Sequence, residues 1–525
     1  MKNRVSQLDW PVFGVSGGLL LIFVIVAGIS MDAVSAFVNT SFALSIKYFG
    51  AFWQVLLLAT FFIAIFLAFS KYGQVKLGKL DRPEFTTFKW LAMTMTTLLA
   101  GGGVFWAAAE PIYHFTSLPP LFKGVQPGTA EAVSPALAQS FMHWGFLAWA
   151  VLGTLSTIVI MYGHYHKGMP LKPRTLLYPI FGEKIMTKSV LGTAVDSFSI
   201  LAVVAGTIGP IGFLGLQASY GLQEIMGIPD TYMTQLYIII SVVAVSAISA
   251  ATGLHKGIEF LSNFNVILAI VLMAFILFFG PGEFIVNAFV SSFGTYLQEF
   301  MPMSTFRGDS AWLGGWTIFF WGWFIGYGPM MAIFIACISR GRTIKEIIMA
   351  VAIIAPIVTC FWFTVLGGTG ISFELVNPGS IAGPLQEAGL PAAMISITKY
   401  LPLSSLIGPA FLVLTILFVI TTSDSMAYTI SAAVTGNNNP KVGLRMFWAL
   451  MMGVIAAILL SIGNGGIDAL QSFIVVTAVP VSLILAPMCW LAPKVAGQLA
   501  EEQGIINKKL PSDKDIYDNV NASEI

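Results

Sequence analysis

Long apolar runs recur along the whole chain and are separated by mostly short polar connections. About 20 apolar residues in a helix cross the ~30 Å hydrocarbon core of a bilayer, so each run is long enough for one crossing. The pattern predicts about twelve transmembrane helices, at residues 12–30, 50–70, 87–109, 137–163, 191–219, 233–253, 260–281, 314–338, 345–366, 404–432, 443–462 and 467–492. Two connections are longer, 282–310 and 367–402, and the first carries an amphipathic run that predicts a helix along the outer membrane surface.

Basic residues alternate between the connections. Lys and Arg precede the first run and follow every second run after it, whereas residues 220–233 and 461–468 contain none. Cytoplasmic loops of membrane proteins carry an excess of Lys and Arg. We expect a multi-pass protein of the cell inner (plasma) membrane, and the alternation predicts that both termini lie in the cytoplasm.

Composition agrees with a membrane protein and excludes several other classes. The 525 residues are 57% hydrophobic and 10% charged, whereas a soluble chain carries about 25% charged residues. A formal net charge of +1 gives no basis for a nucleic-acid partner. No nucleophile–base pair or metal-ligand cluster is apparent, so we expect no enzyme and no cofactor. We expect residues 1–525 to form a single transmembrane domain with short cytoplasmic tails.

Glycines interrupt two of the predicted spans. Gly101–Gly103 are consecutive in the third span, and Gly326, Gly328 and Pro329 lie about 225 residues later in the eighth. An opened helix is tolerated in a membrane where it is buried in protein or lines a cavity, and paired interruptions in two halves indicate a transport site at a repeat interface. We therefore predict five-helix repeats at about 87–281 and 314–492, inverted because five is odd. The alternative is that the glycines only permit close helix packing.

Aromatic side chains gather beside the second interruption, namely Trp316, Trp321, Trp323, Phe324 and Tyr327. Aromatic belts lie at the headgroup level, but this group runs into the centre of its span. The group predicts a ligand site; packing or lipid contact is the alternative.

Two segments carry a family resemblance. Residues 321–329 read Trp-x-Trp-Phe-x-x-Tyr-x-Pro and are followed by Ile-Ser-Arg-Gly-Arg-Thr-Ile-Lys-Glu at 338–346, while His-Trp-Gly stands at 143–145. They resemble the signature segments of the betaine/choline/carnitine transporter (BCCT) family, and the resemblance covers about residues 8–493. It implies an all-α, leucine-transporter-like fold with inverted repeats, a homotrimer in the lipid bilayer, and import of an osmolyte as a secondary transporter.

The resemblance also implies a small zwitterionic or cationic substrate and the residues that bind it. A quaternary ammonium group has no hydrogen to donate, whereas aromatic faces attract it, each by ~0.5–2 kcal/mol. The predicted set is Tyr113, Trp144, Trp149, Trp321, Trp323, Phe324 and Tyr327, with the backbone of Gly101, Gly102 and Gly103. The family more often has tryptophan at positions 324 and 327 and tyrosine at 152, where this chain has Phe324, Tyr327 and Leu152. The substrate is therefore left open among betaine, choline, carnitine and related solutes.

Hydroxyl groups in the tenth span predict a sodium site. Thr421 and Thr422 match a Thr-Ser pair that the family uses to bind Na⁺, with Phe418 and the backbone oxygens near Leu98 and Gly101 as partners. The alternative is that these hydroxyls only bond back to the preceding turn. Thr207 in the fifth span implies a weaker second sodium site.

Three intramembrane carboxylates keep proton coupling open. Buried ionisable groups in membranes mark pathways, partners or proton relays. Glu110 and Asp196 lie near span ends, where we expect a capping or interfacial role, and Asp424 is expected to anchor the hydroxyl run or pair with a basic residue. The rival hypotheses are a proton-coupled choline-type transporter, an importer of a non-quaternary zwitterion, and a solute-binding membrane sensor.

Overall fold

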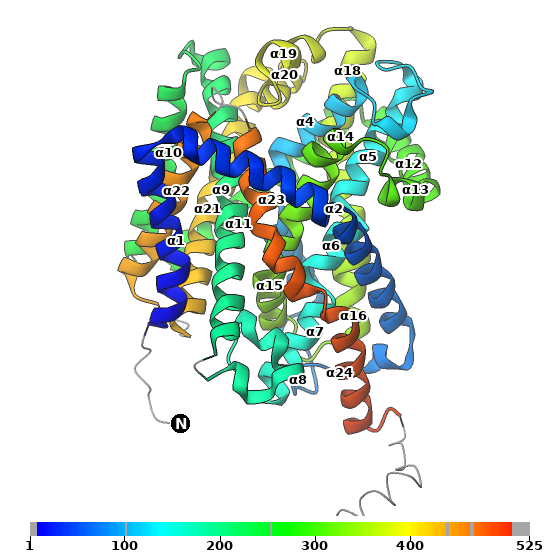
Figure 1. The fold of residues 1–525 in the computed structure, drawn as a ribbon. Helices are drawn as coiled ribbons and strands as arrows, with labels where there is room; N and C mark the ends of the chain where they lie inside the picture. The colour runs from blue at the N-terminus through cyan, green and yellow to red at the C-terminus, as the bar shows by residue number, and fades with distance from the viewer. Residues whose placement is uncertain are drawn as a thin grey trace, which may run out of the picture.

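The structure is a computed structural model that describes residues 8–506 except 100–101, 188, 253–254, 437–439 and 463–466, with the backbone alone at 96–99, 249–252 and 255–262. The described chain folds into a bundle of helices (Figure 1). Its first thirteen α-helices are α1 (Trp10–Ile29), α2 (Met31–Phe69), α3 (Thr87–Leu99), α4 (Gly103–Thr116), α5 (Val133–Trp144), α6 (Phe146–Gly153), α7 (Leu155–Met161), α8 (Tyr178–Phe181), α9 (Val190–Met226), α10 (Tyr232–Thr252), α11 (His255–Phe279), α12 (Gly282–Gln298) and α13 (Phe300–Thr305).

The later α-helices and the short turns complete the chain. The α-helices are α14 (Ser310–Leu313), α15 (Phe319–Ile338), α16 (Ile344–Met349), α17 (Ala355–Phe363), α18 (Thr369–Val376), α19 (Ala382–Ala388), α20 (Ala392–Lys399), α21 (Ser404–Thr435), α22 (Val442–Ser461), α23 (Asp468–Leu485) and α24 (Met488–Glu502). The π-helical turns are η4 (Tyr162–His166), η7 (Gly314–Ile318), η8 (Ala350–Ile354) and η9 (Thr364–Gly368). The 3₁₀ turns are η1 (Lys71–Gln74), η2 (Pro120–Phe122), η3 (Ala130–Ala132), η5 (Pro173–Leu177) and η6 (Gly182–Ile185).

The membrane spans follow the apolar runs. Within the described residues, nine helical segments are long and apolar enough to cross a bilayer, and a tenth counts if α11 and α12, bent by 103°, form one span. The third predicted span is divided between α3 and α4, and the sixth corresponds to the shorter apolar helix 232–248. The fold is therefore all-α and polytopic, while twelve complete crossings stay a prediction.

Small residues place the central helices in close contact. The fourth span and α9 are buried throughout their most apolar windows, whereas α1 is largely exposed. A methyl group added at Gly209 or Gly212 of α9 would lie 2.8 and 2.4 Å from the side chains of Ile474 and Leu470 in α23. In lipid, such small residues allow helices to approach until their backbones nearly touch. The central position of α9 follows from this sequence.

The two predicted interruptions differ in the structure. The third span is interrupted at Gly102, whose backbone (φ −174°, ψ −2°) is not helical and which directly precedes α4; residues 100–101 lie outside the described residues. The break predicted in the eighth span is wrong, since α15 continues through Pro329. Its glycines serve packing instead: a methyl at Gly328 would lie 2.7 Å from Leu485, and one at Gly326 would lie 3.4 Å from Ala202. The irregular part of this span is the π-helical turn η7 at its start.

The two long connections are helical. The amphipathic run predicted to lie along the surface forms α12, which turns by 103° from α11. The ninth span extends to Val376 at the end of α18, beyond its predicted end at 366. The rest of the second connection folds into α19 and α20 at the end of the bundle opposite the N-terminus (Figure 1).

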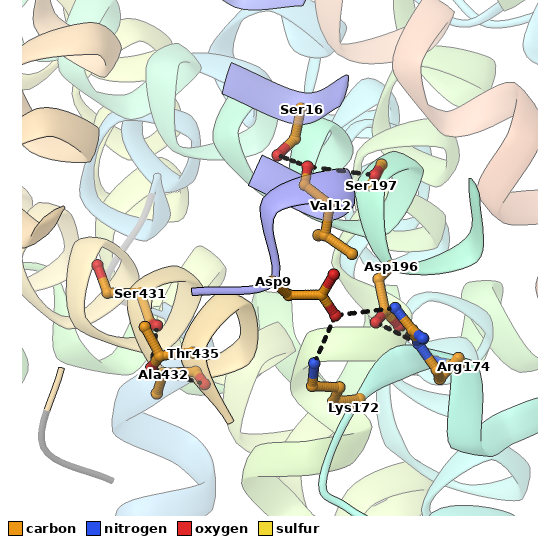
Figure 2. Close-up of polar contacts among 10 residues, drawn as sticks. All are labelled: Asp9, Val12, Ser16, Lys172, Arg174, Asp196, Ser197, Ser431, Ala432 and Thr435. Carbon is orange, nitrogen blue, oxygen red and sulfur yellow. Dashed lines mark hydrogen bonds and ion pairs between the residues drawn. The ribbon is translucent and has the colours of Figure 1, made fainter. Parts of the chain in front are cut away.

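Ion pairs fix the end of the bundle where the chain begins. Asp9 accepts hydrogen bonds through Oδ2 from Lys172 Nζ at 2.9 Å and from Arg174 Nη2 at 3.2 Å (Figure 2). Arg174 also donates through Nε to Asp196 Oδ2 at 2.6 Å. Asp196, expected to be interfacial, is buried and neutralised by this arginine. The N-terminal segment is thus tied to the loop before α9.

A second buried ion pair joins the tenth and eleventh spans. Arg445 Nη2 of α22 lies 3.3 Å from Asp424 Oδ1 of α21, and both side chains are buried. The prediction that Asp424 pairs with a basic residue is confirmed. Pairing allows both charges to stay in the bundle.

Candidate functional site

Trp323 lies at the centre of a buried group of aromatic rings contributed by three spans. Its indole N–H donates to the carbonyl oxygen of Gly206 in α9 at 3.1 Å, which orients the ring. Its ring centroid lies 5.9 Å from those of Trp144 in α5 and Phe213 in α9. Phe319, one turn earlier in α15, stacks on it at 5.6 Å. Side chains from the fourth, fifth and eighth spans therefore meet at this indole.

Two more predicted residues lie next to this centre. Phe324 packs edge-on against Trp144, with the ring centroids 5.3 Å apart. Tyr327 turns toward α9: its hydroxyl oxygen is 3.1 Å from Oγ1 of Thr207, and a methyl at Gly206 would lie 2.3 Å from its ring. The absence of a side chain at Gly206 is therefore what admits Tyr327.

The other three predicted rings lie apart from Trp323. Trp321 is fully buried and donates to the carbonyl of Met142 at 3.4 Å. It points away from Trp323 because residues two apart project to different sides of a helix. Trp149 is buried in α6 and makes no ring contact within the described part of the chain. Tyr113, toward the end of α4, packs on Trp316 at 4.5 Å. Substrate contact by these three residues stays a prediction.

Gly145 explains why Trp144 and Trp149 separate. It ends α5 directly after Trp144, and α6 begins at the next residue. The hydroxyl of Tyr296 accepts a hydrogen bond from the first backbone N–H of α6, at Phe146, at 3.1 Å. A methyl at Gly145 would lie 2.7 Å from that hydroxyl. The His-Trp-Gly segment thus ends α5 directly after Trp144.

The interrupted third span touches the central ring through Gly102. A methyl at this position would lie 2.7 Å from Cη2 of Trp323. Its neighbour Gly103 accepts a hydrogen bond from Trp362 Nε1 of α17 at 2.8 Å. Gly101 lies outside the described residues. The break between α3 and α4 therefore brings backbone, with no side chain between, against Trp323.

This contact predicts that Gly102→Ala weakens substrate binding. Overpacking a closely filled site costs ~1–3 kcal/mol, so we expect the KM for uptake to rise about tenfold. The measurement is initial uptake, normalised to the amount of folded protein. Gly315→Ala is the matched control, because nothing lies within 4 Å of a methyl there. An unchanged KM in Gly102→Ala would contradict the contact.

A fully buried carboxylate joins the third, fourth and eighth spans. Glu110 Oε1 lies 2.5 Å from Nδ1 of His143, and Oε2 accepts the indole N–H of Trp144 at 2.9 Å. His143 Nε2 lies 2.9 Å from Thr317 Oγ1 in η7. His114 Nε2 is 3.4 Å from Glu110 Oε1. This network holds the N–H edge of Trp144, while Trp323 and Phe324 contact the ring.

The expectation of an interfacial or capping role for Glu110 is wrong, because its carboxylate lies inside the bundle. The sequence signal was available: His143 and Trp144 are both hydrogen-bond donors in a span that must pack beside α4. Glu110, His114 and His143 also place ligand atoms within 4.8 Å of one another, a set that could take a metal ion. Hydrogen bonds to Trp144 and Thr317 already account for this geometry.

We expect Glu110 and Trp144 to be coupled in substrate binding. Glu110→Ala leaves the Trp144 N–H and a His143 nitrogen without their acceptor, and a buried unsatisfied group costs ~1–3 kcal/mol. Trp144→Phe keeps a ring but removes the donor, so the double variant should bind substrate better than additivity predicts. Substrate affinities of the four proteins measure this, with the exposed Glu131→Ala as control. Strict additivity would contradict the coupling.

The hydroxyls of the predicted sodium site differ in their bonding. Thr421 Oγ1 donates back to the carbonyls of Leu417 and Phe418, at 2.8 and 3.0 Å. Thr422 Oγ1 is buried and has no hydrogen-bond partner within the described residues. Thr422 therefore offers an uncommitted oxygen, while Thr421 shows the back-bonding that the sequence left open.

The remaining sodium ligands are less fully placed. Gly101 lies outside the described residues, and Leu98 is described only as part of the backbone of α3. Thr207 Oγ1 donates to the carbonyl of Val203 at 2.8 Å and also contacts Tyr327. A second sodium ion at Thr207 stays a prediction.

Comparison with known proteins decides the family. A family model described as "BCCT, betaine/carnitine/choline family transporter" matches residues 11–501. This chain belongs to the BCCT family. Membership confirms a multi-pass membrane transporter rather than an enzyme.

Relatives of this BCCT-family chain cover nearly its full length. Glycine betaine transporter 2 of Vibrio parahaemolyticus is 54% identical over 500 residues, which are 95% of this chain and 92% of the relative. Glycine betaine transporter OpuD of Bacillus subtilis is 33% identical, covering 93% of this chain and 94% of its own. The ectoine/hydroxyectoine transporter of Virgibacillus pantothenticus is 32% identical, covering 92% and 95%.

A solved Na⁺-coupled sialic acid symporter matches 85% of this BCCT-family chain and 85% of its own. The sequence identity is 16% and the TM-score is 0.41.

Proposed function

We propose that this BCCT-family member imports a betaine-type osmolyte, with glycine betaine as the first candidate, by Na⁺ symport. The observation that carries the proposal is the convergence of Trp144, Trp323 and Phe324 beside the broken third span. Aromatic faces hold quaternary ammonium groups, each by ~0.5–2 kcal/mol. The relatives named as glycine betaine transporters support this choice.

The same site keeps other solutes as alternative substrates in this proposal. Choline and carnitine carry the same quaternary ammonium group, and the relative named for ectoine keeps a non-quaternary zwitterion as a candidate. Phe324 and Tyr327 replace tryptophans of the family pattern and weaken the ring faces. We expect glycine betaine to bind best, as the relatives named as glycine betaine transporters suggest.

Na⁺ is proposed as the coupling ion because Thr422 has an uncommitted, buried hydroxyl next to Thr421. Hard cations prefer oxygen ligands, and an interrupted transporter helix frees backbone carbonyls for this purpose. Proton coupling is the second candidate, favoured by the buried contact of 2.5 Å between Glu110 and His143.

The molecular setting belongs to the same proposal. We place the protein in the cell inner membrane as a homotrimer, with both termini in the cytoplasm and the inverted repeats at about 87–281 and 314–492. The basic connections support the orientation, and the family resemblance supports the trimer and the repeats.

A binding panel tests the substrate class. Purified full-length protein is titrated with glycine betaine, choline, carnitine, ectoine and alanine as an unrelated zwitterion, in sodium or potassium buffer. We expect the tightest binding for glycine betaine in sodium, with a quenching of tryptophan fluorescence because the ligand contacts indoles. If ectoine bound most tightly, the proposal of a quaternary ammonium substrate would be contradicted. Equal binding in sodium and potassium buffer would contradict Na⁺ as the coupling ion.

A further inference from the structure

Residues around α19 and α20, helices that lie at the end of the bundle opposite the start of α1 (Figure 1), line a large cavity. We call it the outer cavity; its volume is about 530 Å³. It is lined by Leu216 of α9, by Asp230 just before α10 and Gln235 within α10. The turn between α19 and α20 and Asp468 in the first turn of α23 complete the lining. With both termini in the cytoplasm, this cavity faces the outside of the cell.

The ionisable side chains that line the outer cavity are both acidic. Asp230 Oδ1 accepts hydrogen bonds from Ser219 Oγ at 2.5 Å and from Gln235 Nε2 at 3.0 Å. Asp468 is exposed and makes no hydrogen bond or ion pair within the described part of the chain. Lys399, on the nearby α20, is committed to Glu224. The cavity therefore carries two negative charges with no cation of the protein among its lining residues.

Gln235 adds an uncommitted oxygen. Its side chain is 8% exposed, and although Nε2 is bound to Asp230, Oε1 has no hydrogen-bond partner among the described residues. A buried amide oxygen without a partner is unfavourable, so a ligand that accepts its lone pair would stabilise it. Carboxylate and amide oxygens together are the ligands of a hard cation.

The lining favours an alkali ion over a quaternary ammonium group. A quaternary ammonium needs aromatic faces, and the cavity offers one ring, Tyr232, whose hydroxyl is committed to the carbonyl of Ala457 at 3.1 Å. The oxygens of Asp230, Asp468 and Gln235 suit a small ion that exchanges water for oxygen ligands.

A second, small and separate cavity also borders α9. We call it the inner cavity; its volume of about 10 Å³ has room for one water molecule. Gln217, next to Leu216 in sequence, lines it together with Gly102 and Phe418. Gln217 is 2% exposed and its Oε1 also lacks a partner among the described residues. Uncommitted oxygens therefore occur at two depths between the outer surface and the predicted sodium ligands.

From these observations we propose that the outer cavity collects Na⁺ and delivers it along α9, past Gln217, to the site at Thr421 and Thr422. The inference rests on the proposed Na⁺ symport and adds the entry route and its residues. Acidic clefts with low-dielectric walls concentrate counter-ions and raise their association rate. Asp468 supplies uncommitted charge at the entrance, and Asp230 and Gln235 hold the ion deeper in the cavity.

The test compares Asp468→Asn with wild type in proteoliposomes, as initial uptake of glycine betaine against external Na⁺, with potassium keeping the ionic strength constant. We expect the half-saturating Na⁺ concentration to rise about three- to tenfold. The maximal rate and the KM for glycine betaine at saturating Na⁺ should not change. Raising the total ionic strength should reduce the difference, because salt screens exposed charges.

Glu283→Gln is the control, since it removes an exposed carboxylate that does not line the cavity. Gln235→Leu keeps every charge and removes the uncommitted oxygen, so it should also raise the half-saturating Na⁺ concentration; melting temperatures establish that each variant is folded. An unchanged Na⁺ dependence in both variants overturns the inference while leaving Na⁺ symport intact. A raised betaine KM with unchanged Na⁺ dependence assigns the cavity to the substrate instead. If uptake by the wild-type protein does not depend on Na⁺, both the Na⁺ symport and the entry route are overturned.

Discussion

Replacing Trp323 by alanine is expected to abolish measurable uptake of glycine betaine. The substitution removes the ring that Trp144, Phe213 and Phe319 all contact, together with the N–H bond to the carbonyl of Gly206. Loss of one desolvated cation–π partner costs ~2 kcal/mol, or about 30-fold in affinity. Displacement of the neighbouring rings should add to that loss. Substrate titration and uptake, both normalised to folded protein, measure the effect.

Three further variants separate a binding role from a packing role. Trp323→Phe keeps a ring face and should retain part of the affinity. Trp316→Ala, whose ring packs on Tyr113 rather than on Trp323, should be milder. Trp448→Ala removes an equally buried indole of α22, so it should lower the melting temperature with little change in affinity. Equal affinity in wild type and Trp323→Ala would contradict the cage.

Removing both tenth-span hydroxyls, as Thr421→Ala with Thr422→Ala, is expected to raise the half-saturating Na⁺ concentration at least about tenfold. Water must replace each lost oxygen ligand, or the coordination position stays empty. A tenfold change in Na⁺ affinity corresponds to ~1.4 kcal/mol of binding free energy. Because Thr422 has the uncommitted hydroxyl, Thr422→Val alone should account for most of the effect. Uptake measured over a series of Na⁺ concentrations checks both statements.

Thr422→Ser is the matched control for this prediction, since it keeps the hydroxyl and removes only a methyl group. It should leave the Na⁺ dependence near that of wild type. If Thr422→Val and Thr422→Ser behaved alike, the methyl and not the oxygen would be responsible, and the sodium site would have to lie elsewhere.

The sequence predicted nine of the spans that the described residues show, because hydrophobic length is a local property that a bilayer imposes on each helix. It also predicted the interruption of the third span, which the structure shows at Gly102, a residue with no side chain to support a helix. The same reasoning failed at Pro329. There the glycines face Leu485 and Ala202 on neighbouring helices, so packing explains them and α15 continues.

The donors His143 and Trp144 are visible in the sequence, but their pairing with Glu110 is not. Glu110 and His143 are 33 positions apart, and their contact depends on how α4 packs against α5. The choice of rings around Trp323 has the same cause. Phe213 was not predicted because its place in the group depends on the position of α9, while Trp149 is separated from Trp144 by the end of α5 at Gly145.

Uptake of radiolabelled glycine betaine into proteoliposomes, driven by an inward Na⁺ gradient, tests the central claim most directly. The account predicts accumulation above the external concentration with the Na⁺ gradient, none when potassium replaces sodium, and none with Trp323→Ala in either condition. Accumulation in potassium buffer under an inward proton gradient, with no response to Na⁺, would contradict Na⁺ symport.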